Sequence, residues 1–167
     1  MITNLLRSRS KFARRLPGLV VAFAAFIIAT GSVSANASCQ KVQGHYDEHF
    51  VFGEPCTAEL CVAGDFDGDI QGDFFASILT QTPGAVESVQ IFTSGTVIHA
   101  RINGRQGDLT IANTGAFNAT GDIVDLQFIT GGTGQLQNAS GVIRASGTFD
   151  FTTGTGRSVY EGTICLP

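Results

Sequence analysis

The segment Ile129–Gly141, ITGGTGQLQNASG, decides which fold the sequence encodes, because its glycines fit either a phosphate-binding loop or a bend in a β-protein. A phosphate-binding loop places its glycines between a strand and a helix. Gly132-Thr133-Gly134 supplies the first two glycines of a GxGxxG pattern, but Gln137 stands where the third is needed. The following residues, Val142–Phe149, alternate between apolar and polar as a strand does. We therefore predict a strand-to-strand connection, in which glycine supplies backbone angles that other residues resist.

In the rest of the chain after residue 37, no segment shows sustained helical periodicity. Short runs rich in Val, Ile, Phe and Thr are separated by glycine, which is typical of a β-sandwich or barrel. Eight or nine antiparallel strands in one small domain lose their exposed edges by closing into a barrel. We expect strands at Gln40–Phe52, Leu60–Phe66, Ile70–Thr80, Val86–Thr93, Thr96–Ile102, Asp108–Asn113, Ile123–Thr130, Ser140–Thr152 and Ser158–Cys165. We expect turns at Gly95, Asn103-Gly104, Gln106-Gly107, Thr114-Gly115 and Gly154-Thr155-Gly156.

The N-terminal residues have the pattern of a secretory signal peptide. A basic head is followed by the apolar run Leu19–Ala29 and by Ala35-Asn36-Ala37, which fits an A-x-A cleavage site. The alternative is a retained anchor, but the run is shorter than the roughly 20 residues that a membrane-spanning helix needs. We predict that residues 1–37 form the signal peptide and that residues 38–167 form one secreted or periplasmic domain. The basic residues of the head are Arg7, Arg9, Lys11, Arg14 and Arg15.

The predicted mature domain is strongly acidic. Cleavage removes 5 of the 10 basic residues and none of the 14 acidic ones, which leaves a net charge of −9 with His neutral. Such a surface repels phosphate backbones, so nucleic acid is excluded as a partner. We expect no membrane association once the signal peptide is removed.

All four cysteines lie in the mature domain, and an even number in an exported chain indicates two disulfides. Of the three possible connectivities we favour Cys56–Cys61, which closes a small loop, and Cys39–Cys165, which ties the two ends. If the first and last strands pair antiparallel, the second of these bonds lies at the closing seam of the barrel. The alternative is a metal site, but no paired CxxC spacing supports it. We predict no metal and no cofactor.

Two acidic or His-rich segments resemble metal motifs. His45 and His49 fit an H-x-x-E-H zinc pattern, but on a strand they lie about 13 Å apart, too far for one zinc ion. The segment from Asp65 begins like an EF-hand loop, yet Ile70 and Ala76 stand at its glycine and closing Glu positions. A calcium site of another type and a solvated hairpin remain the two interpretations of this segment.

Candidate catalytic residues are found on the strand Thr96–Ile102. If its polar face points into the barrel, His99 moves protons near neutral pH and Arg101 holds an oxyanion or carboxylate. The alternative, which we favour, is that this face meets water outside the barrel. Alternation alone does not say which face is inside. Further candidates are the acids Asp125 and Glu161 for catalysis, Tyr160 and Arg144 for ligand binding, and Gln127 and Asp150 beside them.

The segment Gly131–Gly141 also resembles the GGTGxFxxAxG motif of dirigent and allene oxide cyclase proteins, with Leu136 in place of the usual Phe. Gly147-Thr148-Phe149 and Tyr160-Glu161-Gly162 are similar to secreted bacterial relatives of that group. The resemblance covers roughly Gly95–Cys165. It implies an all-β, calycin-like closed antiparallel barrel of eight strands, with an apolar cavity and often a trimeric assembly.

Two functions are consistent with such a barrel. One is binding of a small apolar molecule in the cavity, with steering of a cyclisation or isomerisation if the protein is an enzyme. The other is a non-catalytic binding or structural module whose interior is filled by Phe side chains, since most of the 13 Phe of the chain lie in the mature domain. An open cavity lined by His99 or Arg101 would favour the first, and packed Phe rings would favour the second.

Overall fold

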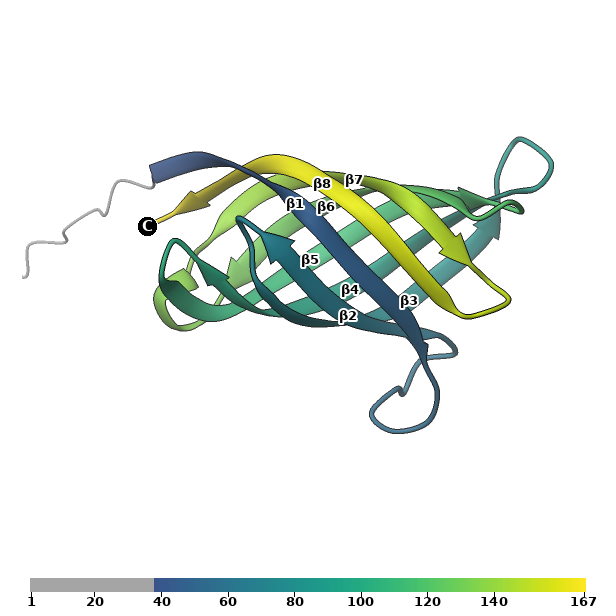
Figure 1. Cartoon of the computed structure of the whole chain (residues 1–167), viewed down its shortest axis with the longest axis horizontal. Helices are drawn as coiled ribbons and strands as arrows, with labels where there is room; N and C mark the ends of the chain where they lie inside the picture. Colours follow the sequence, from purple (N-terminus) through teal and green to yellow (C-terminus); the bar gives the residue numbers. More distant parts are fainter. Residues whose placement is uncertain (1–37) are drawn as a thin grey trace, which may run out of the picture. The chain divides into compact units, whose positions relative to one another are not determined.

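The protein is a closed antiparallel barrel of eight strands in a computed structural model that describes residues 38–167 (Figure 1). The predicted signal peptide, residues 1–37, lies outside the described residues. Each strand pairs with its neighbours in sequence, and β1 pairs with β8 to close the barrel. The predicted fold class is therefore confirmed. The strands are β1 (Ser38–Val51), β2 (Cys61–Gly68), β3 (Gly72–Pro83), β4 (Val89–Ile102), β5 (Arg105–Asn118), β6 (Asp122–Gly132), β7 (Ser140–Asp150) and β8 (Thr155–Leu166).

Several glycines predicted as turns lie inside strands instead. Gly95 pairs with Ala112 within β4 and β5, so the two short strands expected on either side of it are one strand. Thr114-Gly115 and Gln106-Gly107 likewise lie within β5. At Gly107 and Gly115 the turn predictions were wrong because glycine in a strand also serves where another group packs too closely for a side chain. At Gly95 no such close contact exists, and the glycine simply continues the strand. The turn at Asn103-Gly104 is confirmed, and both residues have positive φ angles, of 49° and 78°.

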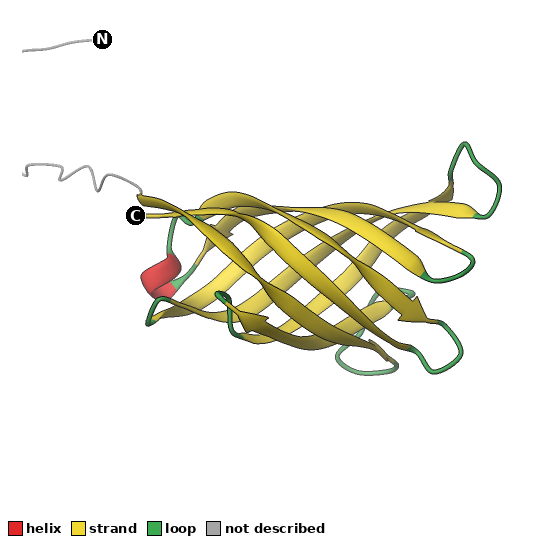
Figure 2. Ribbon diagram, turned by 45° about the horizontal axis from the view of Figure 1, so that its top comes forward, coloured by secondary structure: helices red, strands yellow, loops and turns green. Residues whose placement is uncertain are grey.

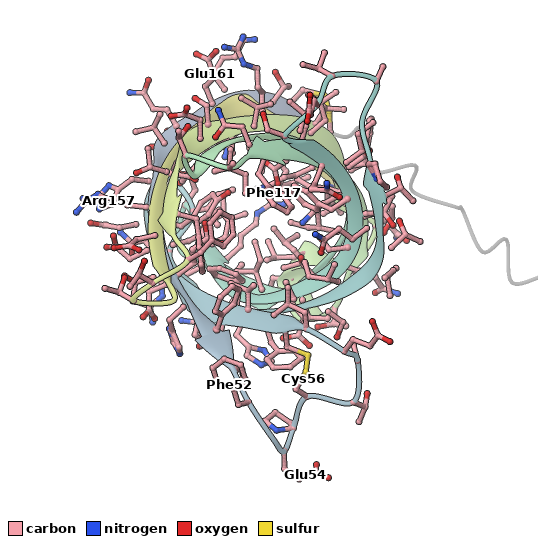
Figure 3. The ribbon with its side chains drawn as sticks, turned by 90° about the vertical axis from the view of Figure 1, so that its right-hand side faces the viewer. Phe52, Glu54, Cys56, Phe117, Arg157 and Glu161 are labelled. Atoms are coloured by element: carbon pink, nitrogen blue, oxygen red, sulfur yellow. A yellow bond between two sulfur atoms is a disulfide. The ribbon has the colours of Figure 1, made fainter. Side chains whose placement is uncertain are left out.

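One face of each strand points into the barrel and the other points outward. On β1, Val42 and Tyr46 are buried, whereas the odd-numbered residues around them are more exposed. Figure 3, a view along the barrel, shows Phe117 inside the ring of strands and Arg157 and Glu161 outside it.

One end of the barrel is filled. A short 3-10 helix, η1 (Gly134–Leu136), follows β6 and lies at the end of the barrel where the C-terminus is found (Figure 2). It brings the fully buried Leu136 into the interior. Because η1 joins β6 to β7, the segment Ile129–Gly141 contains a strand-to-strand connection, as predicted. The aliphatic side chains packed with Leu136 include Val42, Ile70, Ile98, Ile102, Leu109, Ile111, Ile143, Ile164 and Leu166.

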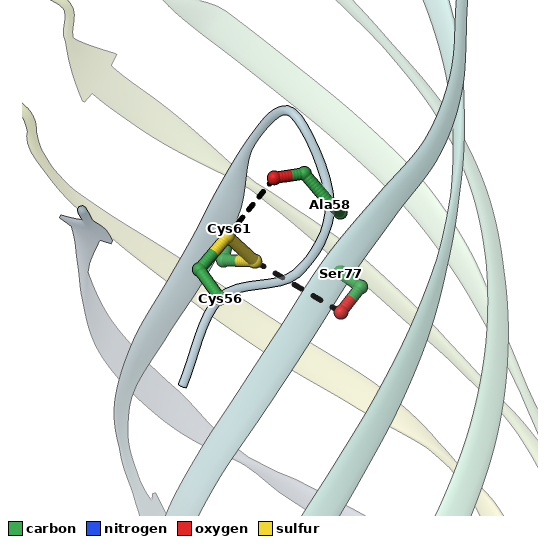
Figure 4. Close-up of a disulfide and its surroundings, with 4 residues drawn as sticks. All are labelled: Cys56, Ala58, Cys61 and Ser77. Atoms are coloured by element: carbon green, nitrogen blue, oxygen red, sulfur yellow. Dashed lines mark hydrogen bonds between the residues drawn. A yellow bond between two sulfur atoms is a disulfide. The ribbon is translucent and has the colours of Figure 1, made fainter. Parts of the chain in front are cut away.

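Both predicted disulfides are present. Cys39 on β1 pairs with Cys165 on β8 across the closing seam. Cys56–Cys61 closes the loop between β1 and β2. Cys61 Sγ lies 4.0 Å from Oγ of Ser77 on β3, a contact drawn as a dashed line in Figure 4. Within residues 38–167, no helix has the length and apolar character needed to cross a bilayer.

Candidate functional site

The end of the barrel opposite η1 contains a cavity of about 100 Å³. Its walls are mostly aromatic and aliphatic, and its side chains come from inward-facing positions of β1 to β7 and from the loops that follow β1 and β7. The aromatic residues that line it are Tyr46, Phe50, Phe66, Phe74, Phe92, Phe117, Phe149 and Phe151.

Five of these rings form a connected group, which we call the aromatic rim, at the strand ends that surround the cavity. Successive ring centroids lie 4.6 Å apart for Phe50 and Phe149, 5.4 Å for Phe149 and Phe151, 5.4 Å for Phe151 and Phe117, and 6.2 Å for Phe117 and Phe92. These separations fall in the range of favourable aromatic pairs, about 4.5–7 Å. The rim therefore presents a continuous apolar wall around the cavity.

A polar cluster interrupts the apolar wall. Gln127 on β6 donates from Nε2 to the carboxylate of Asp125, at 3.2 and 3.4 Å, and to the hydroxyl oxygen of Tyr46 at 3.4 Å. Asp125 is 9% exposed and Gln127 is 4% exposed. Glu48 on β1 also lines the cavity. Glu48 and Asp125 are referred to below as the acid pair.

Each member of the acid pair lies opposite a glycine on a neighbouring strand. Glu48 pairs with Gly156 on β8, where a Cβ atom would lie 3.0 Å from Glu48 Oε1. Asp125 pairs with Gly115 on β5, where a Cβ atom would lie 2.6 Å from the Cβ of Asp125. The two glycines leave the space that the inward-pointing carboxyl groups occupy, so the sequence accommodates acids inside an apolar barrel.

The surroundings of the acid pair favour protonation. Burial raises the pKa of Glu48 from about 4.5 to about 7, and the charge of Asp125 adds to this rise. Burial also raises the pKa of Asp125 to about 6, although the hydrogen bond from Gln127 opposes the change. The pKa of Tyr46 is raised by burial and then by the charges of Asp125 and Glu48. No Lys, Arg or His of the described chain lines the cavity, so nothing there compensates the two carboxylates.

Asn113 on β5 contributes a further polar group. Its Nδ2 donates to Oγ of Ser94 and to Oγ1 of Thr96, at 3.0 Å each. Oδ1 of Asn113 and Oε1 of Glu48 are both buried, and neither atom has a hydrogen-bond partner within residues 38–167. Buried polar atoms normally have a partner, so two unpaired acceptors beside one cavity call for an explanation.

Most of the predicted site residues lie outside the cavity. His99 and Arg101 are exposed because the odd-numbered residues in this half of β4 face outward, which is the alternative that the sequence favoured. The side chain of His99 lies 2.6 Å from Asp108 and 4.0 Å from Asp73, and its hydrogen bond to Asp108 is the main cause of its raised pKa. Arg144 and Glu161 are opposite each other on the outer wall of β7 and β8.

Of the remaining candidates, Asp125 and Gln127 line the cavity and Tyr160 does not. The hydroxyl group of Tyr160 accepts from the backbone N–H of Ile70 at 2.9 Å and donates to its carbonyl oxygen at 3.3 Å, which occupies it in a structural contact. Asp150 is exposed, and its carboxylate accepts from the backbone N–H of Thr152 in the turn before β8.

Sequence reasoning missed Glu48 and Asn113. The period-two pattern that placed Tyr46 and Phe50 on one apolar face also places Glu48 on that face, and this acid in an apolar row was the available signal. Asn113 was expected to end a strand, whereas β5 continues to Asn118.

The described residues contain no group of three or more His, Cys, Asp or Glu side chains placed to hold a metal ion. Asp65, Asp67 and Asp73 of the calcium-like segment are exposed on β2 and β3. Asp69, which is also exposed, accepts a hydrogen bond from the backbone N–H of Gln43 at 2.9 Å.

Comparison with known proteins gives one family and several similar structures, two of which are pterocarpan synthase dirigent proteins. The family described as Protein of unknown function (DUF3224) matches residues 34–161. A search of curated proteins gave no match. The pterocarpan synthase dirigent protein GePTS1 is 14% identical, with a TM-score of 0.49, over 78% of this chain and 91% of that chain. The pterocarpan synthase dirigent protein PsPTS1 is 15% identical, with a TM-score of 0.33, over 77% of this chain and 96% of that chain.

Proposed function

This chain belongs to the DUF3224 family, and we propose that it is an exported barrel protein that binds a small apolar molecule in its cavity. The observation that carries the proposal is an aromatic cavity with two uncompensated carboxyl groups in its wall. A barrel that served only as a filled module would not need buried acids, because each costs free energy to remove from water.

The dimensions of the cavity set the size of the ligand. Pockets for drug-sized molecules measure about 300–1,000 Å³, and an engineered apolar cavity of about 150 Å³ is large enough for benzene. The cavity of about 100 Å³ therefore suits one ring or a short chain. A longer ligand would extend past the aromatic rim.

The acid pair gives this cavity a means of acting on its ligand. With pKa values of about 7 for Glu48 and about 6 for Asp125, one carboxyl group is largely ionised near neutral pH while the other is partly protonated. Such a pair can give a proton at one position and accept one at another, as a cyclisation or isomerisation requires. We propose this steering role for Glu48 and Asp125, with Gln127 holding the carboxylate of Asp125 in place.

Methyl NMR tests cavity binding directly, with toluene as the probe. We expect toluene to shift the methyl resonances of the cavity residues Val62, Ala76 and Ile78 and to leave those of Val97 and Val142 on the outer wall unchanged. The opposite distribution of shifts, or no shift at all, would contradict the proposal.

A matched pair of variants strengthens this test. Ala76→Phe fills the cavity from β3, where Ala76 is 6% exposed, and should abolish the toluene shifts. Ala85→Phe adds the same ring to an exposed position in the loop between β3 and β4 and should leave them intact. Retained binding in the Ala76→Phe protein would place the toluene site elsewhere.

We also propose that the protein acts outside the cytosol. Its two disulfides support export, because such bonds persist in oxidising compartments. N-terminal sequencing of the protein from the secreted or periplasmic fraction should begin at Ser38. A chain that retains residues 1–37 in the membrane fraction would contradict this proposal.

The outer wall of β4, β5 and β6 supports a further proposal, that the protein is a homo-oligomer. Its outward residues pair across the strands as Ile91 with Ala116 and Val124, as Thr93 with Thr114 and Leu126, and as Gly95 with Ala112 and Phe128. These three rows carry no charge, whereas the described domain as a whole is strongly acidic. An uncharged, partly apolar surface of this kind is typical of a protein interface.

A further inference from the structure

The charged groups in the cavity wall are all of one sign. Among the residues that line it, Glu48 and Asp125 are the ionisable acids, and no basic side chain is present to pair with them. The basic side chains of the described chain are instead on other parts of the barrel: Lys41, Arg101, Arg105, Arg144 and Arg157. A buried carboxylate without a counter-ion is costly, so a cation that enters the cavity gains more than it would from an exposed acid.

We propose that the cavity selects apolar amines, and that Glu48 and Asp125 bind the ligand's ammonium group while the aromatic rings surround its apolar part. This inference rests on the proposed function and names its ligand class. It concerns a site inside the barrel, so it is separate from the acidic residues on the outer surface.

The unpaired atoms of the site fit an ammonium group. Oε1 of Glu48 and Oδ1 of Asn113 are buried acceptors without a partner. An ammonium group offers three donors and no acceptor, so it can satisfy such oxygens and leave none of its own groups unpaired. A ligand carboxylate would add acceptors and negative charge to a site that already has both. The hydrogen bonds of Asn113 Nδ2 to Ser94 and Thr96 occupy the amide donor that could otherwise have bound an anion.

The aromatic walls fit the same ligand class. Phenyl rings attract a cation through their faces, and this attraction is stronger where water is excluded. Phe92 and Phe149 line the cavity together with the acid pair, and both are nearly buried, at 7% and 5% exposure. The net negative charge of residues 38–167 also raises the local concentration of cations around the protein.

Calorimetric titration of the full mature protein with three probes of one shape tests the inference. Benzylamine, benzyl alcohol and benzoate share a ring and differ in the charge of the attached group. At pH 7.5 we expect benzylamine to bind roughly ten-fold more tightly than benzyl alcohol, which corresponds to one charge-assisted hydrogen bond, and benzoate to bind most weakly. Benzyl alcohol reports whether the cavity binds apolar molecules at all.

Two nearly isosteric variants locate the effect. Glu48→Gln and Asp125→Asn should each reduce the affinity for benzylamine about five- to ten-fold and leave that for benzyl alcohol within about two-fold. Glu161→Gln, which removes an exposed acid from the outer wall of β8, should change neither affinity.

The pH dependence in the unaltered protein provides a measurement that does not depend on the folding of any variant. Glu48 is faced by Asp125 and Tyr46, and no basic group of the described chain lines the cavity with them. The affinity for benzylamine should therefore rise between pH 5 and pH 7.5, as the acid pair loses its protons, while that for benzyl alcohol stays flat.

The possible failures are distinguishable. If benzyl alcohol binds as tightly as benzylamine, or if neither acid variant reduces the preference for benzylamine, the amine selection by the acid pair is refuted and cavity binding stands. If none of the three probes binds, both the proposed function and this inference fail.

Discussion

Asp125 on β6 lies directly across from Gly115 on β5, where a Cβ atom would approach the Cβ of Asp125 to 2.6 Å. The same hypothetical atom would lie 2.6 Å from the ring of Phe92. Asp125 can therefore occupy its position only because residue 115 has no side chain. Glu48 and Gly156 repeat this arrangement on the other side of the cavity.

Gly115→Ala should displace Asp125 and Phe92. We expect a loss of about 1–3 kcal/mol in the free energy of unfolding, the usual cost of overpacking, and weaker binding of benzyl alcohol. Urea denaturation and calorimetry measure the two effects. Gly131→Ala is the control, because nothing lies within 4 Å of a Cβ atom there. Equal behaviour of the two variants would show that Gly115 does not shape the cavity.

Glu48→Gln should change how stability depends on pH. Because the folded state raises the pKa of Glu48 from about 4.5 to about 7, it holds this proton more tightly than the unfolded chain does. Stability is then lost as pH rises from about 4.5 to about 7. The variant lacks this loss, so at pH 8 it should be more stable than the parent by on the order of 2–3 kcal/mol, with no gain below pH 4.5. Urea denaturation at several pH values checks this, with Glu161→Gln as the exposed control. A parallel pH profile for parent and Glu48→Gln would contradict the burial of this carboxyl group.

The two disulfides should contribute unequally to stability. Cys39–Cys165 joins residues 126 positions apart, whereas Cys56–Cys61 joins residues 5 positions apart. Since the entropy lost by the unfolded chain grows with the length of the closed loop, the Cys39→Ser/Cys165→Ser variant should lose about 4–5 kcal/mol and the Cys56→Ser/Cys61→Ser variant about 2 kcal/mol. Thermal and urea unfolding of both double variants measure this order. A larger loss for the short loop would show that the seam closes without help from its disulfide.

Leu126→Glu should dissociate the proposed homo-oligomer. The substitution places a charge in the middle of the uncharged rows on β4, β5 and β6, and burying that charge in an interface is unfavourable. Analytical ultracentrifugation should show a smaller species than for the parent. Val86→Glu, at an exposed position in the loop between β3 and β4, is the matched control and should not change the mass. A monomeric parent protein would contradict the proposal outright.

The sequence predicted the barrel and its two disulfides because those features depend on local signals. Period-two alternation marks the strands, and the cysteine positions near both ends mark the seam. Strand boundaries were less accurate where glycine was read as a turn, as at Gly95 and Gly115. The packing that requires Gly115 involves side chains from other strands, Phe92 on β4 and Asp125 on β6.

The site was harder to predict than the fold. On β4, Val97 and Ile98 are adjacent apolar residues on opposite faces, so composition did not tell inside from outside. Asp125 was among the predicted candidates, yet its partner Glu48 comes from β1 and is brought near it only when the barrel closes. The closure of the barrel and the register of its strands decide which polar residues meet in the cavity. The sequence of a single strand specifies neither of them.

The claim that an acid pair lies beside a ligand cavity can be measured directly by carbon-13 NMR titration of the Glu48 and Asp125 carboxyl groups, without ligand and with benzylamine. We expect titration near pH 7 for Glu48 and near pH 6 for Asp125 in the free protein, a lower pKa for Glu48 in Asp125→Asn, and lower pKa values for both groups when the amine is bound. Carboxyl groups that titrate near pH 4 in the free protein, and that do not respond to benzylamine, would contradict it.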